Sequence, residues 1–307
     1  IFLGDQLADV FDQVAKGGAT ASKEKGTLLV GVDTLPALPS DPGDRNRTSP
    51  FAFTGNRFEF RAPGSGQSIA GPMVAINTMM ADSLDFIAGQ IETMQSAGED
   101  FNSSVQKVLE RIITDHGRVI FNGDGYSPDW QEEASTRGLK NLRTTVDALV
   151  ELDSADVRSL FAQYDVLSER ELASRHEVYL EQYCLSVGVE ARLTLEMGRT
   201  IVLPAAMRHQ AGMADGLVNL QSLGVPFDSS ILDRLSTSVA ELTSSLMALE
   251  SALLEVDALS AVEEATHARD VLLPAMQDVR GASDDLEDMV ADDLWPLPTY
   301  QEMLHLL

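Results

Sequence analysis

The sequence predicts an α+β fold in which a short region with strands leads into a long, mostly helical region. Two runs near the start, residues 27–32 and 51–61, are rich in the β-branched and aromatic residues typical of strands. From Ser68 onward, apolar residues recur at helical spacing instead. We therefore expect two parts: residues 1–165 contain the strands, and residues 166–307 form a helical hairpin or bundle, with the boundary inside a continuous helix.

The elements of the first part follow one another in a simple order. Residues 3–14 have the periodicity of a helix that ends at paired glycines, and the two strands come next. Residues 68–94 are apolar around much of the helix circumference, which predicts a buried helix, whereas residues 100–117 form an amphipathic one. Ser127 followed by Pro128 marks another helix start.

The second part is helical throughout. The pattern from Ser168 is helical for more than forty residues and is broken only by Pro204, which should kink or split the helix. The next helix carries a heptad seam of leucines and valines from residue 232 to 256. We expect residues 259–279 to fold back along this seam within one chain. A contact between subunits is the other interpretation of the same pattern.

The charge balance excludes several classes of partner. The chain has 307 residues, with 22 Lys and Arg against 48 Asp and Glu, a formal net charge of −26. Such a chain is repelled by phosphate backbones and by anionic lipid surfaces, so we expect neither nucleic acid nor a membrane as partner. The acidic residues are concentrated toward the C-terminal end, where residues 227–307 hold 17 Asp and Glu against 3 Lys and Arg.

The cysteine and histidine residues show no spacing that would predict a metal site. The single Cys184 excludes an internal disulfide, and we expect it to be a small buried side chain in a reducing, cytoplasmic setting. No run of about 20 apolar residues is present to span a bilayer. The chain opens on Ile1 without a signal peptide, which we interpret as the later part of a longer protein. The histidines are isolated, which favours packing or surface roles: His116, His176, His209, His267 and His305.

The clearest chemical pattern lies in the second strand run. Strand alternation puts Arg57, Glu59 and Arg61 on one face of the strand. Phe58 and Phe60 lie on the other face, which we expect to be buried. Arginine clamps carboxylates and phosphates, and glutamate supplies a hard oxygen ligand for Mg²⁺. The charged face therefore predicts a site that binds anions together with a divalent cation.

A ladder of salt bridges on a solvated sheet face is the simpler interpretation of an Arg-x-Glu-x-Arg strand. Two further arginines, Arg45 and Arg47, precede this strand, so four arginines fall within 17 positions of a very acidic chain. Their concentration beside a Gly-Ser-Gly loop favours the binding site over the ladder.

These residues resemble a known family. The segment NRTSPFAFTGNRFEFR is similar to that of glutamine synthetases, in which an Asn-Arg-Ser/Thr loop precedes an Arg-x-Glu-x-Arg strand, and with GSGQSIAGP it is most similar to the type III enzymes. Weaker similarities extend from IFLGDQL at the start, through FNGDGYS and LFAQYDVLSERELASRHEVYLEQY, to LWPLPTY near the end. The resemblance implies that residues 1–165 hold the last strands and helices of the catalytic domain, and residues 166–307 the helical region typical of type III.

The resemblance also implies an activity. It implies an ATP-dependent ligase that joins ammonia to glutamate through a γ-glutamyl phosphate, with Mg²⁺ or Mn²⁺ and a ring-shaped homo-oligomer, a dodecamer in the family. Matched position by position, Glu59 is the metal-binding glutamate, Arg61 holds the substrate glutamate, Arg57 contacts the ATP phosphates and Arg47 stabilises the transferred phosphoryl group.

Several features of the family are missing from this sequence. The commoner glutamine synthetases have an arginine five residues after the loop arginine, where this chain has Ala52. The family's N-terminal β-grasp domain, Glu-x-Glu metal motif and Gly-rich phosphate loop would all lie before Ile1, so we expect the chain alone to be inactive. Two other hypotheses stay open: a non-enzymatic helical interaction module, and a related ligase that joins glutamate to another amine.

Overall fold

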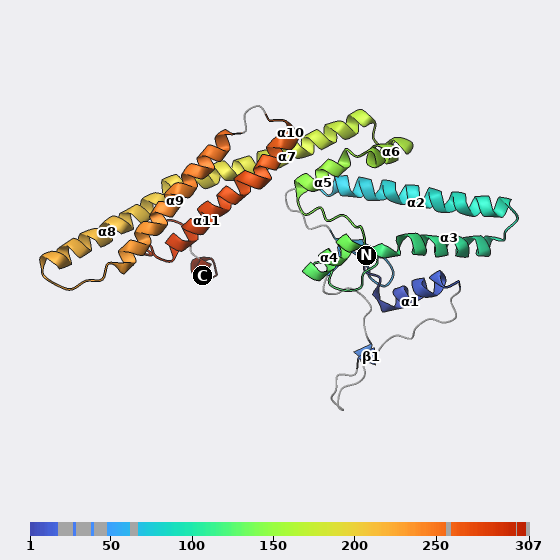
Figure 1. Cartoon of the computed structure of the whole chain (residues 1–307), viewed down its shortest axis with the longest axis horizontal. Coiled ribbons are helices and arrows are strands. Elements are labelled where there is room, and N and C mark those ends of the chain that lie inside the picture. Colours follow the sequence, from blue (N-terminus) through green and yellow to red (C-terminus); the bar gives the residue numbers. More distant parts are fainter. Residues whose placement is uncertain are drawn as a thin grey trace. The chain divides into compact units, whose positions relative to one another are not determined.

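The computed structural model describes residues 1–17, 27–28, 38–39, 48–61, 67–255, 259–298 and 300–304. Within these residues helices dominate, and the strands form two short antiparallel pairs, β1–β2 and β3–β4. The first elements in chain order are α1 (Gly4–Ala15), β1 (Thr27–Leu28), β2 (Leu38–Pro39), β3 (Phe51–Phe53), β4 (Phe58–Phe60), α2 (Ala70–Ser96), α3 (Phe101–His116), a 3₁₀ turn (Gly117–Val119), α4 (Pro128–Thr136), α5 (Thr145–Leu152) and α6 (Ala155–Gln163) (Figure 1).

The remaining elements are helical. They are α7 (Glu169–Met197), a π-helical turn (Gly198–Val202), α8 (Leu203–Ser222), α9 (Ser230–Leu254), α10 (Ala261–His267), a second π-helical turn (Ala268–Leu272), α11 (Leu273–Glu287) and α12 (Tyr300–Leu304).

Two compact units divide these elements. The first unit comprises residues 1–143 with 159–166, and the second comprises residues 144–158 with 167–307. Both strand pairs belong to the first unit. The division of the sequence at 165/166 into two domains stays a prediction, and residues 165 and 166 lie between α6 and α7 rather than inside a helix.

Residues 51–61 form a hairpin, so the expectation of one continuous strand is wrong. β3 pairs antiparallel with β4, with Ala52 opposite Glu59. Gly55, in the turn between them, has a φ of +95°, a conformation that glycine adopts without strain. Phe2 adds a parallel bridge to Ala52. Of the other expected strand, the described part is Thr27–Leu28, paired with Leu38–Pro39, and its remaining residues lie outside the described part of the chain.

Helix α2 is largely exposed, although its composition predicted a buried helix. α3 packs against α2, and Thr78 is the buried residue of the helix. Apolar side chains elsewhere on its surface face solvent, among them Met80 and Leu84, the latter 59% exposed. The composition indicated how much apolar surface the helix presents, but not whether a described neighbour covers it.

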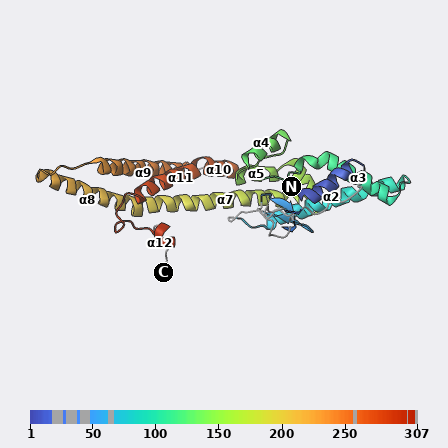
Figure 2. The same cartoon turned by 90° about the horizontal axis from the view of Figure 1, so that it is seen from below.

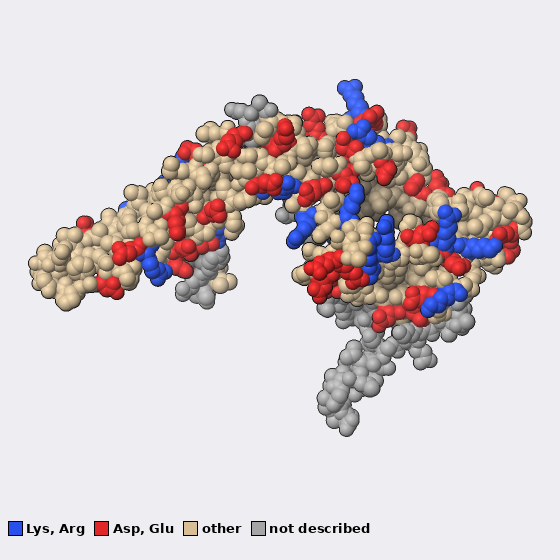
Figure 3. Space-filling model, in the orientation of Figure 1, with Lys and Arg blue, Asp and Glu red and all other residues tan. Residues whose placement is uncertain are grey.

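The second unit is built on one long helix, made of α7 and α8, against which three further helices pack. α7 begins at a capping box, in which Ser168 and Glu171 satisfy each other's backbone amides. α7, the first π-helical turn and α8 run continuously, and α9, α10 and α11 lie along one side of this long helix (Figures 1 and 2). Acidic side chains are scattered over the visible face, whereas the tip of the α8–α9 hairpin is mostly uncharged (Figure 3).

Each π-helical turn precedes a proline. Proline lacks an amide hydrogen and its ring clashes with the carbonyl four residues earlier, so a wider turn keeps the helix continuous. Before Pro204 this wider turn is Gly198–Val202, and it keeps the helix continuous, so the possible split at Pro204 is not found and a kink there stays a prediction. The same arrangement recurs at Ala268–Leu272 before Pro274, which the periodicity of residues 259–279 did not predict. An added Cβ at Gly198 would lie 2.5 Å from Leu246, so glycine allows this turn to approach α9 closely.

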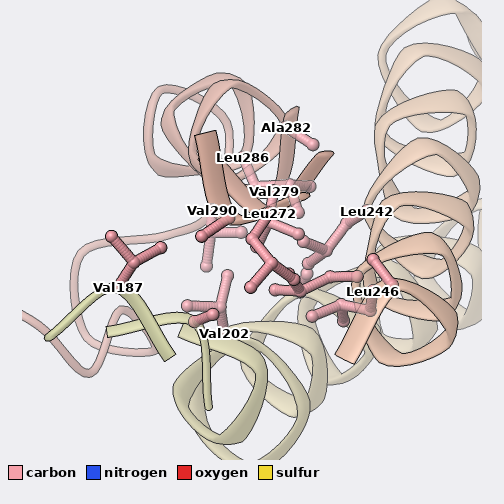
Figure 4. Packing of buried hydrophobic residues seen from close by; sticks show 14 of the residues in the cluster. Val187, Val202, Leu242, Leu246, Leu272, Val279, Ala282, Leu286 and Val290 are labelled. Atoms are coloured by element: carbon pink, nitrogen blue, oxygen red, sulfur yellow. The ribbon is translucent and has the colours of Figure 1, made fainter. Parts of the chain in front are cut away.

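The leucine seam of α9 is buried against helices of the same chain. Leu235, Leu242, Leu246 and Leu249 all lie in the main core of the unit. Their partners come from α7, α11 and both π-helical turns, as Figure 4 shows for Val187, Val202, Leu272, Val279 and Leu286. The pattern was also open to an intermolecular interpretation, but within the described residues the seam is covered intramolecularly.

Replacing a seam leucine tests this packing. We expect Leu242→Ala to lower the free energy of unfolding by about 2–5 kcal/mol, because it removes a fully buried side chain and leaves a cavity. Met247→Ala on the exposed side of α9 is the control and should change it by less than about 0.5 kcal/mol. Urea titration followed by circular dichroism measures both, and equal effects would contradict the described packing.

Candidate functional site

The charged face of the β3–β4 hairpin brings three of the predicted site residues together. Glu59 lies in the middle of β4, and the two arginines flank that strand. Arg57 Nη2 lies 3.6 Å from one Glu59 carboxylate oxygen, and Arg61 Nη2 lies 3.2 Å from the other. The prediction that the three side chains share one face of the strand is therefore confirmed.

The two arginines are held to different degrees. The Arg61 side chain is 15% exposed, and its guanidinium also donates to the backbone oxygen of Ser49 at 3.4 Å. Its backbone amide donates to the Pro50 oxygen at 2.7 Å. Arg57, in contrast, is 73% exposed. Arg61 is thus fixed at the base of the hairpin, whereas Arg57 extends from its turn into solvent.

The aromatic face of the hairpin is not buried, so that expectation is wrong. Phe58 is 45% exposed and Phe60 is 37% exposed. The rings pack on one another instead: Phe58 stacks on Phe51 with 5.5 Å between centroids and also contacts Phe53 at 5.3 Å. Strand alternation correctly separated the aromatic side chains from the charged ones, but it carries no information about which face a neighbour covers.

The opposite strand explains one departure from the family pattern. Ala52 is fully buried, between Glu59 across the hairpin and Phe2 on its other side. Phe2 donates its amide to the Phe51 oxygen and accepts from the Phe53 amide, at 3.0 and 2.9 Å. An arginine side chain at position 52 would have no room here, so this chain could not supply that contact from the same place.

A turn far along the chain fixes the surroundings of the hairpin. The side-chain oxygen of Asn122 accepts from the amides of Leu3 and Gly4 at 2.9 and 3.1 Å. The amide of Gly125 donates to the Thr48 oxygen at 2.6 Å. FNGDGYS is one of the weaker similarities in the sequence, and its residue types alone predicted no part in the site. Its Asn-Gly-Asp-Gly run was the available signal, since such runs form tight turns.

Two of the predicted arginines lie outside the described residues. These are Arg45 and Arg47, the latter expected to stabilise the transferred phosphoryl group. Across the part of the chain that the structure describes, no group of three or more His, Cys, Asp or Glu residues could hold a metal ion. Glu59 is therefore the metal-ligand candidate whose surroundings are known.

A second polar cluster lies between α2 and the residues that follow α6, in the first unit. The Tyr164 hydroxyl is 3.0 Å from an Asp85 oxygen and 3.3 Å from an Asp82 oxygen. Burial, together with these two carboxylates, raises the pKa of Tyr164 to about 12. The cluster borders an open cavity of about 660 Å³ that His116 also lines.

Cys184 is buried, as the sequence predicted. It packs in a small cluster with Val146, Leu180 and Ala265. Desolvation is the main cause that raises the pKa of its thiol to about 11, with a smaller contribution from Glu264. Since the thiolate is the reactive form, this cysteine is poorly suited to nucleophilic chemistry.

Comparisons with known proteins agree with the resemblance drawn from the motifs. Residues 104–221 match the glutamine synthetase C-terminal domain. Over its whole length the chain is 37% identical to a type-3 glutamine synthetase from Dictyostelium discoideum, of which it covers 43%. It is 32% identical to a glutamine synthetase from Bacteroides fragilis, with 99% of the chain and 43% of the relative covered. A Butyrivibrio fibrisolvens glutamine synthetase is 30% identical, with 44% of it covered.

These findings show that the chain is similar to glutamine synthetases along its whole length, and that residues 104–221 match the C-terminal domain of that family. The similarity includes a type-3 glutamine synthetase, as the motifs around Glu59 predicted. The chain spans less than half the length of the relatives that it matches. In the described part of the chain, no helix has the length and apolar content needed to cross a membrane.

The reactivity of Cys184 provides a test of its surroundings. With a thiol pKa near 11, little thiolate exists at pH 8, and we expect alkylation by iodoacetamide to be much slower than in the unfolded chain. The rate should rise as the pH approaches 11, as far as the fold persists. Mass spectrometry of the peptide that contains Cys184 follows the reaction, and rapid labelling of the folded protein at pH 8 would contradict the described burial.

Proposed function

We propose that this chain contributes part of the active site of a glutamate–ammonia ligase that forms glutamine through a γ-glutamyl phosphate. The observation that carries the proposal is the hairpin face on which Glu59 lies between two arginines at 3.6 and 3.2 Å. Similarity to glutamine synthetases along the chain supports the same reaction class. ATP, glutamate and ammonia are the proposed substrates.

The residues present fit a divalent cation of the kind that the family uses. Mg²⁺ in phosphoryl-transfer sites is typically bound by one or two carboxylates, with waters and substrate phosphates completing its shell. Glu59 offers one such carboxylate and is 38% exposed, so it is accessible to a ligand. When bound, Mg²⁺ or Mn²⁺ would neutralise charge on the transferring phosphoryl group.

The two arginines are suited to different anions. Arg61 is largely buried and anchored at the Ser49 oxygen, so its planar guanidinium can orient a small carboxylate, which we propose is that of glutamate. Arg57 is exposed and extended from the turn, where it can follow the phosphates of ATP. Arg47 is the proposed partner of the transferred phosphoryl group. Positive charge held in place beforehand stabilises the negative charge that develops in the transition state.

The same three side chains satisfy one another before any ligand binds. The Arg57–Glu59 pair is exposed, and such pairs contribute about 0.2–1 kcal/mol, so exchanging Glu59 for a substrate anion at Arg57 costs little.

Other aspects of the proposed function go beyond the hairpin. We expect a ring-shaped homo-oligomer and a cytoplasmic setting. We also predict that this chain alone is inactive, which an assay of glutamine formation by the purified chain tests. A related ligase that uses another amine is the second candidate, separated by competition between ammonia and other amines. A non-enzymatic helical module is the third, favoured by the extent of the helical second unit.

Substitution of Glu59 tests the proposed metal role. In the complete protein that contains this chain, we expect Glu59→Gln to lower glutamine formation by at least about 100-fold, because the amide keeps the shape but loses the charge that binds the metal. Coupled detection of ADP measures the rate.

The matched control is Glu99→Gln. Glu99 is also a salt-bridged surface glutamate of the first unit, paired with Lys107 at 2.6 Å, and lies away from the hairpin. Its substitution should leave the rate within about twofold. Equal rates for the Glu59 and Glu99 variants would leave the hairpin with a structural role.

Substitution of Arg61 tests substrate binding separately. We expect Arg61→Lys to raise the KM for glutamate by about 10-fold or more, because lysine keeps the charge but loses the two-pronged contact with a carboxylate. The KM for ATP should change much less. A variant in which only the KM for ATP rises would assign Arg61 to the nucleotide instead.

A further inference from the structure

The turn at residues 122–125 contacts both segments that support the β3–β4 hairpin. Its Asn122 holds the chain where it enters α1, through the amides of Leu3 and Gly4. Its Gly125 holds the chain just before β3, through the oxygen of Thr48. The hairpin has only two strands of three residues, and such a hairpin is marginally stable by itself.

The first contact leads to Glu59 through one strand pairing. Asn122 fixes Leu3, and the preceding residue, Phe2, exchanges two backbone hydrogen bonds with Phe51 and Phe53. Ala52, between those two, is the residue opposite Glu59. Fixing Leu3 therefore fixes the strand against which Glu59 lies.

The second contact leads to Arg61. Gly125 fixes Thr48, and the oxygen of the next residue, Ser49, accepts from the Arg61 guanidinium. Ser49 is buried, and its hydroxyl donates to the Phe51 oxygen at 2.9 Å. The approach is so close that a Cβ at Gly125 would lie 2.7 Å from the Thr48 oxygen. Thr48 also directly follows Arg47 in the sequence, so the same bond anchors the chain next to that arginine.

We propose that Asn122 and Gly125 are positioning residues, which set the geometry of Glu59 and Arg61 through the segments that precede and flank β3. Asn122 acts through its side-chain oxygen and Gly125 through its backbone amide, and each binds the backbone of a segment beside the site. The inference rests on the proposed function for its catalytic meaning, whereas the support of the hairpin is a property of the structure itself. Partners of this kind hold ligand-binding side chains in place, and their loss commonly weakens metal affinity by about 10- to 100-fold.

The test compares two substitutions of Asn122 in the complete protein. Asn122→Leu keeps the approximate size but removes the oxygen that accepts from Leu3 and Gly4, whereas Asn122→Asp keeps an acceptor oxygen. We expect Asn122→Leu to raise the dissociation constant for Mn²⁺, measured by electron paramagnetic resonance, by about 10-fold or more. It should also lower kcat and speed amide hydrogen exchange in residues 48–61. Asn122→Asp should restore all three towards the wild type.

Gly125 provides an independent test with a matched control. Gly125→Ala places a methyl group against a backbone oxygen and should also raise the Mn²⁺ dissociation constant. Gly117→Ala, in the same unit, meets no atom within 4 Å and should leave both Mn²⁺ binding and the hairpin unchanged.

The outcomes separate this inference from the proposed function. Unchanged Mn²⁺ affinity in Asn122→Leu, with or without faster hydrogen exchange in the hairpin, would overturn the positioning role. A wild-type protein that neither binds Mn²⁺ nor forms glutamine would overturn the proposed function. In that case faster exchange in Asn122→Leu, reversed in Asn122→Asp, would still support the turn as the element that holds the hairpin.

Discussion

Burial of the leucine seam on α9 is the interaction on which the larger, helical unit depends. Each fully buried leucine contributes roughly 1.5–3 kcal/mol, and four of them face one core. This apolar contact must offset the mutual repulsion of many carboxylates, because the chain as a whole carries a net charge of −26. The surface ion pairs cannot do so: Arg199 with Glu250, for example, lies at solvent, where such pairs contribute little. The carboxylates therefore determine the surface charge of the unit, whereas burial of the leucines determines its fold.

The β3–β4 hairpin of the first unit is stabilised differently, because it is too small to have a hydrophobic core of its own. The β3–β4 hairpin is held by backbone hydrogen bonds to Phe2 and by the turn at residues 122–125, rather than by buried aromatic side chains. Its four phenylalanines pack on each other at the surface instead. Hydrogen bonds are directional, so they determine where a carboxylate and a guanidinium lie more sharply than an apolar contact would. A site that must hold charged groups at fixed distances benefits from that property.

The sequence predicted the charged face of the hairpin because alternation along a strand is a local rule, and Arg57, Glu59 and Arg61 obey it. It also predicted the helix start at Ser127 and the burial of Cys184, which follow from the chemistry of single residues and their immediate neighbours. It did not predict the reversal at Gly55, where the chain turns within a run that is strand-forming throughout. It was wrong about α2 and about the phenylalanine face, since burial depends on what packs against a surface and not on the surface alone.

By itself, therefore, the sequence determined the helix periodicity, the excess of acid, the similarity to glutamine synthetases and the residues that could carry chemistry. All of these are encoded by residue type and short-range spacing. Only the tertiary structure decided that the α9 seam is covered within the chain, that Ala52 is enclosed by Phe2, and that Asn122 reaches back to Leu3. The last of these bonds joins residues 119 positions apart, and no local pattern specifies which distant amide an asparagine will meet. That choice is made when the chain folds, because the amides of the buried residues Leu3 and Gly4 must then find an acceptor.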